Sequence, residues 1–255
     1  MTAEPIKQPL EARKLIWKLN RWIGRFSLIG DKTFFDSKDY ETFSWVQPLE
    51  ANWTRIREEL EQVLEYREKL PNFEDIVVHD YSLTQGVQWK MYLFYAYGIK
   101  AKKNCDRCPE TTRLIEGVPG MKTAFFSILP PRKRIPVHRG PYKGVIRYHL
   151  GLKVPQPPTN CGIRVGDDIA HWQEGQSLIF DDSFPHEAWN DTDDVRVVLF
   201  LDVVRPMQFP ASLLNQLVIK LISWSPYIQD CKVSFQKWDQ QLEKLFAKSN
   251  KEHSK

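Results

Sequence analysis

The chain has 255 residues, of which 42% are hydrophobic and nine are tryptophan, so it carries enough apolar surface for a large packed core. Its net charge of +4 is mild, and no nucleic-acid-binding motif accompanies the scattered lysines and arginines. No apolar run approaches the ~20 residues of a membrane span, and the first residues lack the order of a signal peptide. We therefore expect a cytoplasmic globular protein that does not bind nucleic acid, with its oligomeric state left open.

The first predicted element is a basic amphipathic helix over residues 8–29, in which Trp17 and Trp22 alternate with basic residues such as Arg13 and Arg21. Such a helix can lie on an anionic membrane surface. It can equally pack on its own domain, which is the ordinary role of an amphipathic helix. We expect packing on the domain, with peripheral membrane contact through this helix as the alternative.

A second helix is predicted over residues 50–70, and strand-like segments follow at 89–95 and 122–129. Between these strands, Cys105 and Cys108 form a CxxC without the second ligand pair that a structural zinc site uses. We expect either a local disulfide or two plain thiols there.

From about residue 120 to 205, short strand-like segments alternate with Pro- and Gly-rich turns, and no helical period intervenes. This spacing favours an antiparallel sandwich or jelly roll over a parallel sheet. Helical periodicity returns after Pro206. We therefore predict a mainly β protein with flanking helices: an N-terminal extension over 1–84, a β domain over 85–208 and a helical extension over 209–255.

Two strands of this domain carry arginines on one face. In 143–154, alternation puts Arg147 and His149 on the same face, and Arg196 begins a second such strand over 196–204. A buried guanidinium without a partner is costly, so each inward-pointing arginine predicts an anion.

Two histidines, His138 and His186, are flanked by Pro and Gly and are therefore expected where strands meet loops. Two histidines and a carboxylate are typical of non-heme Fe(II) oxygenases. The carboxylate normally stands two residues after the first histidine, where this chain has Gly140. Asp181 or Asp182 could supply it, water could take its place, or both histidines could be structural.

The segments around these histidines resemble the aspartyl/asparaginyl β-hydroxylase family. They are His138-Arg139-Gly140-Pro141 with Arg147-Tyr148-His149-Leu150-Gly151-Leu152, and Trp172-Gln173-Glu174-Gly175-Gln176-Ser177-Leu178-Ile179-Phe180-Asp181-Asp182-Ser183-Phe184-Pro185-His186-Glu187-Ala188-Trp189-Asn190. The resemblance implies a double-stranded β-helix (jelly roll, cupin-like) that uses Fe(II), 2-oxoglutarate and O2. The family has glycine where related enzymes have the carboxylate ligand, so Gly140 matches it.

By this resemblance His138 and His186 bind iron, and Arg196 pairs with the far carboxylate of 2-oxoglutarate. The other positions that match cosubstrate-contacting residues of the family are Trp89, Ser127, Arg147 and His149. A strand serine and a large aromatic are also ordinary core residues, so Ser127 and Trp89 have a purely structural alternative.

The resemblance implies hydroxylation of an unactivated C–H, and we expect the β-carbon of Asp or Asn in a peptide or protein. The alternative is an acyl chain of a lipid, as in lipid A and ornithine-lipid hydroxylases. Basic amphipathic segments at 8–29 and 211–246 would suit a membrane-surface substrate, whereas the lack of a membrane span argues the other way. A second alternative, a non-catalytic cupin-like binding protein, is disfavoured because both histidines and both arginines are present together.

Overall fold

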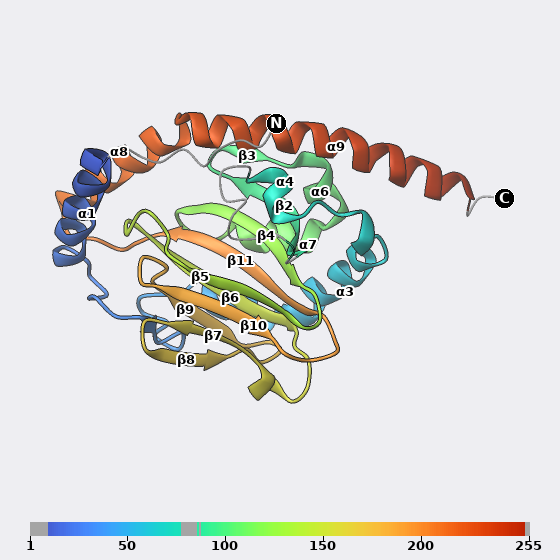
Figure 1. Ribbon diagram of the computed structural model, residues 1–255, viewed down its shortest axis with the longest axis horizontal. Helices are drawn as coiled ribbons and strands as arrows, with labels where there is room; N and C mark the ends of the chain where they lie inside the picture. Colours follow the sequence, from blue (N-terminus) through green and yellow to red (C-terminus); the bar gives the residue numbers. More distant parts are fainter. Residues whose placement is uncertain (1–9, 78–85, 87, 253–255) are drawn as a thin grey trace.

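The computed structural model describes residues 10–77, 86 and 88–252, with side chains described for 18–77, 86 and 88–240. Eleven strands are described: β1 Phe34–Phe35, β2 Lys90–Ala96, β3 Ile99–Lys100, β4 Met121–Leu129, β5 Lys133–His138, β6 Val145–Lys153, β7 Cys161–Val165, β8 Asp168–His171, β9 Ser177–Phe180, β10 His186–Asn190 and β11 Arg196–Val204. They form two antiparallel sheets that face each other (Figure 1), one in the order β1-β9-β6-β11-β4-β2-β3 and the other in the order β5-β10-β7-β8. The fold is the predicted mainly β jelly roll, a double-stranded β-helix flanked by helices.

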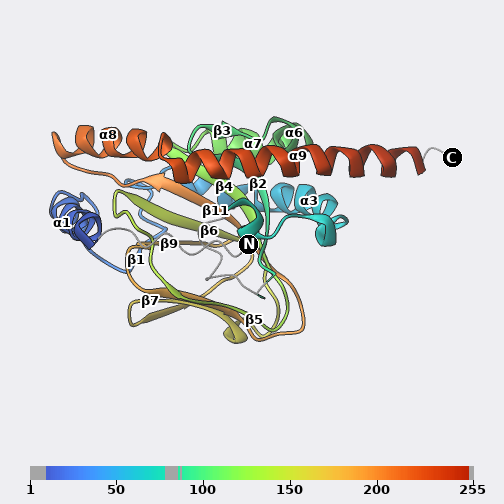
Figure 2. The same ribbon diagram turned by 45° about the horizontal axis from the view of Figure 1, so that its top comes forward.

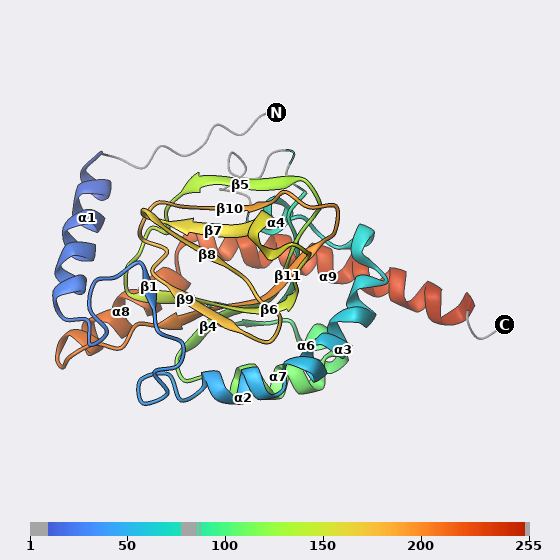
Figure 3. The same ribbon diagram turned by 90° about the horizontal axis from the view of Figure 1, so that it is seen from below.

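The helices gather on the outside of the larger sheet and at its ends. They are α1 Leu10–Arg25, α2 Val46–Ala51, α3 Trp53–Leu64, α4 Phe73–Ile76, α6 Lys102–Arg107, α7 Pro109–Glu116, α8 Ala211–Ser223 and α9 Pro226–Glu252, with short 3-10 turns η1 Arg67–Lys69 and η3 Pro158–Asn160. Figure 3 shows α2, α3 and α7 beneath the larger sheet, on the side away from the smaller one. Figure 2 shows α8 and α9 following one another along one side of the molecule.

Alternation along the strands produces two cores, one on each face of the larger sheet. Val198 and Phe200 of β11 point between the sheets and pack with Ile163 of the smaller sheet. Tyr148 and Leu199 point to the other side, into the core beneath the helices. Arg147, His149 and Arg196 follow the inward parity. The space between the sheets is therefore where the candidate site lies.

The helix predicted over 50–70 begins and ends earlier than expected. The chain is helical from Val46, breaks at Asn52, resumes to Leu64 and then adds only a 3-10 turn. Asn52 leaves the helical conformation, with φ −112°, and its side-chain amide donates to the Pro48 carbonyl at 2.8 Å. A polar side chain that bonds to nearby backbone competes with the helix in this way. Of the two expectations for Cys105, the plain thiol is confirmed, because Cys105 and Cys108 are both free and buried.

Helix α1 packs on the domain, as expected, over its described part. Ile23 is buried, and the Trp22 and Phe26 rings contact each other at a tilt, with centroids 4.7 Å apart. The side chains of Arg13 and Trp17 lie outside the described residues. None of the described helices is both long enough and apolar enough to cross a membrane.

Candidate functional site

All seven residues predicted for the site line one small cavity between the sheets. They are Trp89, Ser127, His138, Arg147, His149, His186 and Arg196. The remaining walls are apolar side chains, namely Ile135, Ile163, Phe180, Ala188 and Phe200. The free volume is about 30 Å³, room for about one water molecule, so a larger ligand requires side chains to move. The fold thus brings together seven predicted site residues, from Trp89 to Arg196, that lie up to 107 positions apart in the chain.

His138 ends β5 and His186 begins β10, and the two are direct partners in the strand register. Their ring centroids lie 4.0 Å apart. In each, Nδ1 faces the carbonyl oxygen two residues earlier, at 2.8 Å from Pro136 and 3.0 Å from Phe184. A carbonyl only accepts, so each Nδ1 donates its hydrogen and each Nε2 carries the lone pair. Burial, with His138 and Arg147 nearby, lowers the pKa of His186 to about 3, so this ring is neutral and ready to bind a metal.

His149 holds the opposite tautomer. Its Nδ1 accepts a hydrogen bond from the indole N–H of Trp172 at 3.3 Å, so Nε2 carries the hydrogen. That Nε2 is buried without a partner in the described structure. Burial and the nearby charge of Arg196 lower the pKa of His149 well below its usual value and keep it neutral. In this tautomer Nε2 can donate a hydrogen bond and offers no lone pair to a metal.

Arg196 is buried with 1% exposure, and its guanidinium stacks over the Trp172 ring at 4.5 Å. One nitrogen, Nη1, donates to the hydroxyl of Ser127 at 3.2 Å, whereas Nε has no partner in the described structure. The hydroxyl also accepts from the Trp89 indole at 2.9 Å, which leaves its own hydrogen to donate. Burial lowers the pKa of Arg196 to about 10, the mark of a cation held without a counter-ion.

Arg147 differs from Arg196 because protein carboxylates already balance its charge. Its Nη2 lies 2.8 Å from Asp182, and its Nε donates to Asp202 at 3.1 Å. Burial opposes its charge, but these two carboxylates raise the pKa of Arg147 overall. The sequence predicted an anion for each arginine, and for Arg147 that anion is protein. Arg147 still lines the cavity, so contact with a cosubstrate stays a prediction.

Asp182 occupies the space where a side chain at residue 140 would stand. A Cβ added at Gly140 would lie 2.1 Å from Asp182 Oδ2 and 2.6 Å from Oδ1. Burial raises the pKa of Asp182 to about 6, although Arg147 opposes that shift. Its Oδ1 is buried without a partner in the described structure. The glycine at position 140 is thus a packing requirement of this carboxylate.

Asp181, the other candidate carboxylate, points away from the histidines. It forms ion pairs with Lys143 at 2.6 Å and with Arg205. Within the described part of the chain, no three His, Cys, Asp or Glu side chains cluster as a metal site would require. The arrangement fits a metal held by two histidines, with other positions left for water or a cosubstrate.

Two residues that contact the candidate site, Trp172 and Asp202, were not predicted from the sequence. Trp172 contacts both Arg196 and His149, and Asp202 holds Arg147. A signal existed for Asp202, because it shares the inward parity of Arg196 on the same strand. For Trp172 the signal was only its place at the start of the second motif.

Comparison with known proteins identifies the family to which the chain belongs. A family model described as Aspartyl/Asparaginyl beta-hydroxylase matches residues 50–206. An ornithine lipid ester-linked acyl 2-hydroxylase of Rhizobium tropici is 37% identical over 242 residues, covering 93% of this chain and 85% of that protein. The human aspartyl/asparaginyl beta-hydroxylase is 28% identical over 210 residues, which cover 76% of this chain but 27% of the human protein.

Among solved structures, a Pseudomonas putida prolyl-4-hydroxylase overlaps 60% of this chain and 87% of its own, with 16% identity and a TM-score of 0.39. The fold assignment rests on the sheet order described above and does not depend on this overlap. The match of the family model over more than half of the residues, with the long bacterial alignment, shows that the chain belongs to the aspartyl/asparaginyl β-hydroxylase family.

Proposed function

We propose that this protein is an Fe(II)- and 2-oxoglutarate-dependent dioxygenase that hydroxylates the acyl chain of a lipid. The observation that carries the reaction class is the division of roles within one cavity. His138 and His186 each keep an Nε2 lone pair available for a metal, whereas Arg196, Ser127 and His149 supply hydrogen-bond donors.

His138 and His186 would hold the iron, with their Nδ1 hydrogens fixed by backbone carbonyls. Such outer partners orient the rings and raise the basicity of the ligands. The unpartnered Oδ1 of Asp182 would accept a hydrogen bond from a metal-bound water, because it is a buried acceptor beside Gly140. A carboxylate would then serve the site without binding the metal.

Arg196 would receive the far carboxylate of 2-oxoglutarate through the guanidinium edge that carries its unpartnered Nε. The Ser127 hydroxyl hydrogen and the His149 Nε2 hydrogen would complete the binding of this anion. Charge-assisted hydrogen bonds of this kind are about twice as strong as neutral ones. When bound, iron with 2-oxoglutarate and O2 supplies the oxidant that replaces an unactivated C–H by C–OH. Phe180 and Phe200 in the walls exclude water from that chemistry.

Two relatives point to two substrates. The relative that covers 93% of this chain is named as a lipid acyl 2-hydroxylase, and it supports the lipid. The human relative, named for aspartyl and asparaginyl β-hydroxylation, supports the peptide that the sequence analysis put first, and we keep it as the second candidate. Both substrates offer a carbon next to a carbonyl group, since the β-carbon of Asp adjoins its side-chain carboxyl. One site geometry could therefore accept either.

The reaction class is tested by calorimetry of 2-oxoglutarate binding to protein loaded with Fe(II) without oxygen. We expect Arg196→Ala to weaken binding several hundred-fold, since removal of one partner from a desolvated charge pair costs ~3–5 kcal/mol. Arg132→Ala, at an exposed arginine paired with Asp193, is the matched control and should change nothing. Unchanged affinity in Arg196→Ala would contradict the assigned anchor.

The substrate is tested by mass spectrometry after incubation of the loaded enzyme with an ester-linked acyl lipid or with peptides containing Asp or Asn. We expect one added oxygen on the acyl chain, dependent on 2-oxoglutarate. Oxygen added only to the peptide would replace the lipid proposal by the second candidate.

A further inference from the structure

Helix α8 and the turns that flank it expose an unusual number of large apolar side chains. Leu213, Leu217 and Leu221, each four residues from the next, are 53–56% exposed, and Trp224 is 64% exposed. The opposite face of the helix packs on the domain through Ala211 and Ile219. A surface helix ordinarily turns a polar face outward, so this second apolar face needs a partner. We call this surface, Phe209, Leu213, Leu214, Leu217, Leu221 and Trp224, the α8 face.

The segment that forms the α8 face carries charge of one sign. No Asp or Glu occurs between residues 206 and 229, where Lys220 is the charged residue. Helix α1 lies at the same end of the molecule as α8 (Figure 1), and Ile23 shares an apolar cluster with Ala211. Lys18 and Arg25 of α1 are exposed. An apolar face with a basic border matches an anionic lipid surface.

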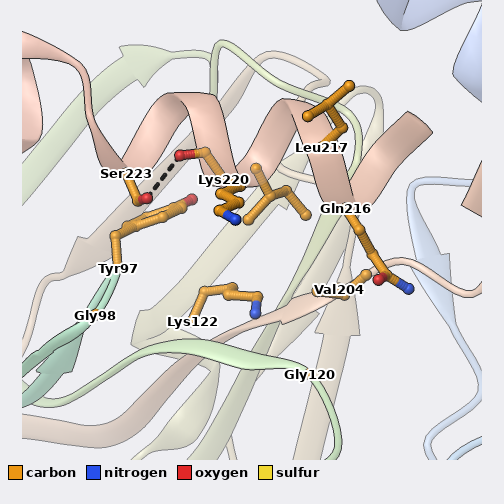
Figure 4. Close-up of a pocket in the computed structure, with 10 residues that line it drawn as sticks. Tyr97, Gly98, Gly120, Lys122, Val204, Gln216, Leu217, Lys220 and Ser223 are labelled. Atoms are coloured by element: carbon orange, nitrogen blue, oxygen red, sulfur yellow. Dashed lines mark hydrogen bonds between the residues drawn. The ribbon is translucent and has the colours of Figure 1, made fainter. Parts of the chain in front are cut away.

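A cavity of about 540 Å³ lies on the inner side of α8 (Figure 4). Leu217 belongs both to its lining and to the α8 face, and Lys122 and Lys220 line it as well. This volume lies within the range of small-molecule binding sites.

The cavity lies close to the candidate site along β11. Val204, in its lining, stands two residues beyond Asp202 on the same face of the strand, about 7 Å further on. Tyr97, also in the lining, is close enough to the buried ion pair that Asp202 contributes, after burial, to the raised pKa of its phenol. The α8 face, the cavity and the site thus follow one another in space.

We propose that the α8 face docks the protein on anionic lipid bilayers, with the cavity behind α8 receiving a lipid from that surface. The proposal rests on the proposed function for the identity of the lipid as substrate, but docking itself needs neither iron nor 2-oxoglutarate. A second copy of the chain is the competing occupant. A symmetric pair through this face would bring Lys220 and its basic neighbours toward their own copies, which like-charge repulsion opposes.

Docking is tested by co-sedimentation of the metal-free full chain with vesicles of phosphatidylglycerol and phosphatidylcholine, and with phosphatidylcholine alone. We expect binding to the anionic vesicles that weakens as salt rises, since screening shortens the reach of the basic border. Leu221→Glu and Trp224→Glu should each lower the vesicle affinity about tenfold or more, because each removes buried apolar area from the interface. Ile169→Glu, at a 59% exposed apolar residue of β8, is the matched control and should bind as the wild type does.

Absence of wild-type binding to anionic vesicles would overturn the proposal, as would an equal loss in Ile169→Glu. A concentration-dependent dimer by light scattering, abolished by Leu221→Glu and without vesicle binding, would assign the face to a second copy. Failure of the wild-type protein to bind 2-oxoglutarate would instead refute the proposed function and leave the docking proposal intact.

Discussion

Gly140→Ala tests the packing of Asp182 against the segment that carries His138. The new Cβ would lie 2.1 Å from Oδ2 and 2.4 Å from Cγ of Asp182, although real contacts of this kind are not shorter than 3.0 Å. The carboxylate would have to move by about 1 Å, yet it is buried and held by Arg147 at 2.8 Å. Overpacking of a filled site costs ~1–3 kcal/mol. For a chain of this length we expect the melting temperature to fall by roughly 2–12 °C.

A double-mutant cycle separates this clash from any other effect of the substitution. Asp182→Ala removes all three atoms that the new Cβ would meet, so Gly140→Ala should cost almost nothing in that background. Gly24→Ala, where the nearest atom is Lys143 Cε at 3.3 Å instead of 2.1 Å, is the matched control and should cost far less stability than Gly140→Ala. Calorimetric unfolding of the metal-free proteins measures each free energy. Equal destabilisation by Gly140→Ala with and without Asp182 would refute the reasoning.

Three further predictions concern the histidines of the site. His138→Ala and His186→Ala should each abolish Mn(II) binding measured by electron paramagnetic resonance. Cooperative unfolding should be retained, because each histidine stands at the end of a strand beside the cavity. Loss of folding in both variants would favour a structural role. Trp172→Phe keeps an aromatic ring under Arg196 but removes the N–H donor that fixes the tautomer of His149. The affinity for 2-oxoglutarate should therefore fall about 3- to 10-fold, while the affinity for the metal stays the same. An equal loss of both affinities would count against a role of Trp172 in positioning His149. Folding lowers the pKa of His149, so below pH ~6.5 the unfolded chain binds a proton at this residue that the folded protein does not bind. The stability of the metal-free protein should therefore fall as the pH drops below ~6.5. His149→Gln should reduce that fall in denaturant titrations, and an unchanged pH slope would contradict it.

The parts of the site that could be predicted from sequence are those fixed by local periodicity. Alternation put Arg147 and His149 on one face, and that face does point between the sheets. The turn residues around His138 and His186 indicated strand ends, and the two residues do end and begin paired strands. The proposed division of the chain at 85 and 208 stays a prediction, and β1 from the first segment pairs with β9 of the central one.

What could not be predicted depends on contacts between distant segments. Arg147 and Arg196 look alike in the sequence, and only the fold gives Arg147 the carboxylates of Asp182 and Asp202. The tautomers of the histidines depend in the same way on which group each Nδ1 meets. The exposure of the α8 face depends on which side of that helix the domain covers, and its composition alone is apolar on both sides.

The charges of the site explain how a metal can bind with two neutral ligands. Asp182 and Asp202 both pair with Arg147, so the charges of Arg147, Arg196 and these two carboxylates sum to zero while both carboxylates are ionised. Fe(II) and the 2-oxoglutarate dianion together add none, whereas either one alone adds two charges to a low-dielectric space. A third, ligating carboxylate at position 140 would upset this balance as well as collide with Asp182. Glycine at that position therefore satisfies both the packing and the electrostatics of a site built to receive the metal and the dianion together.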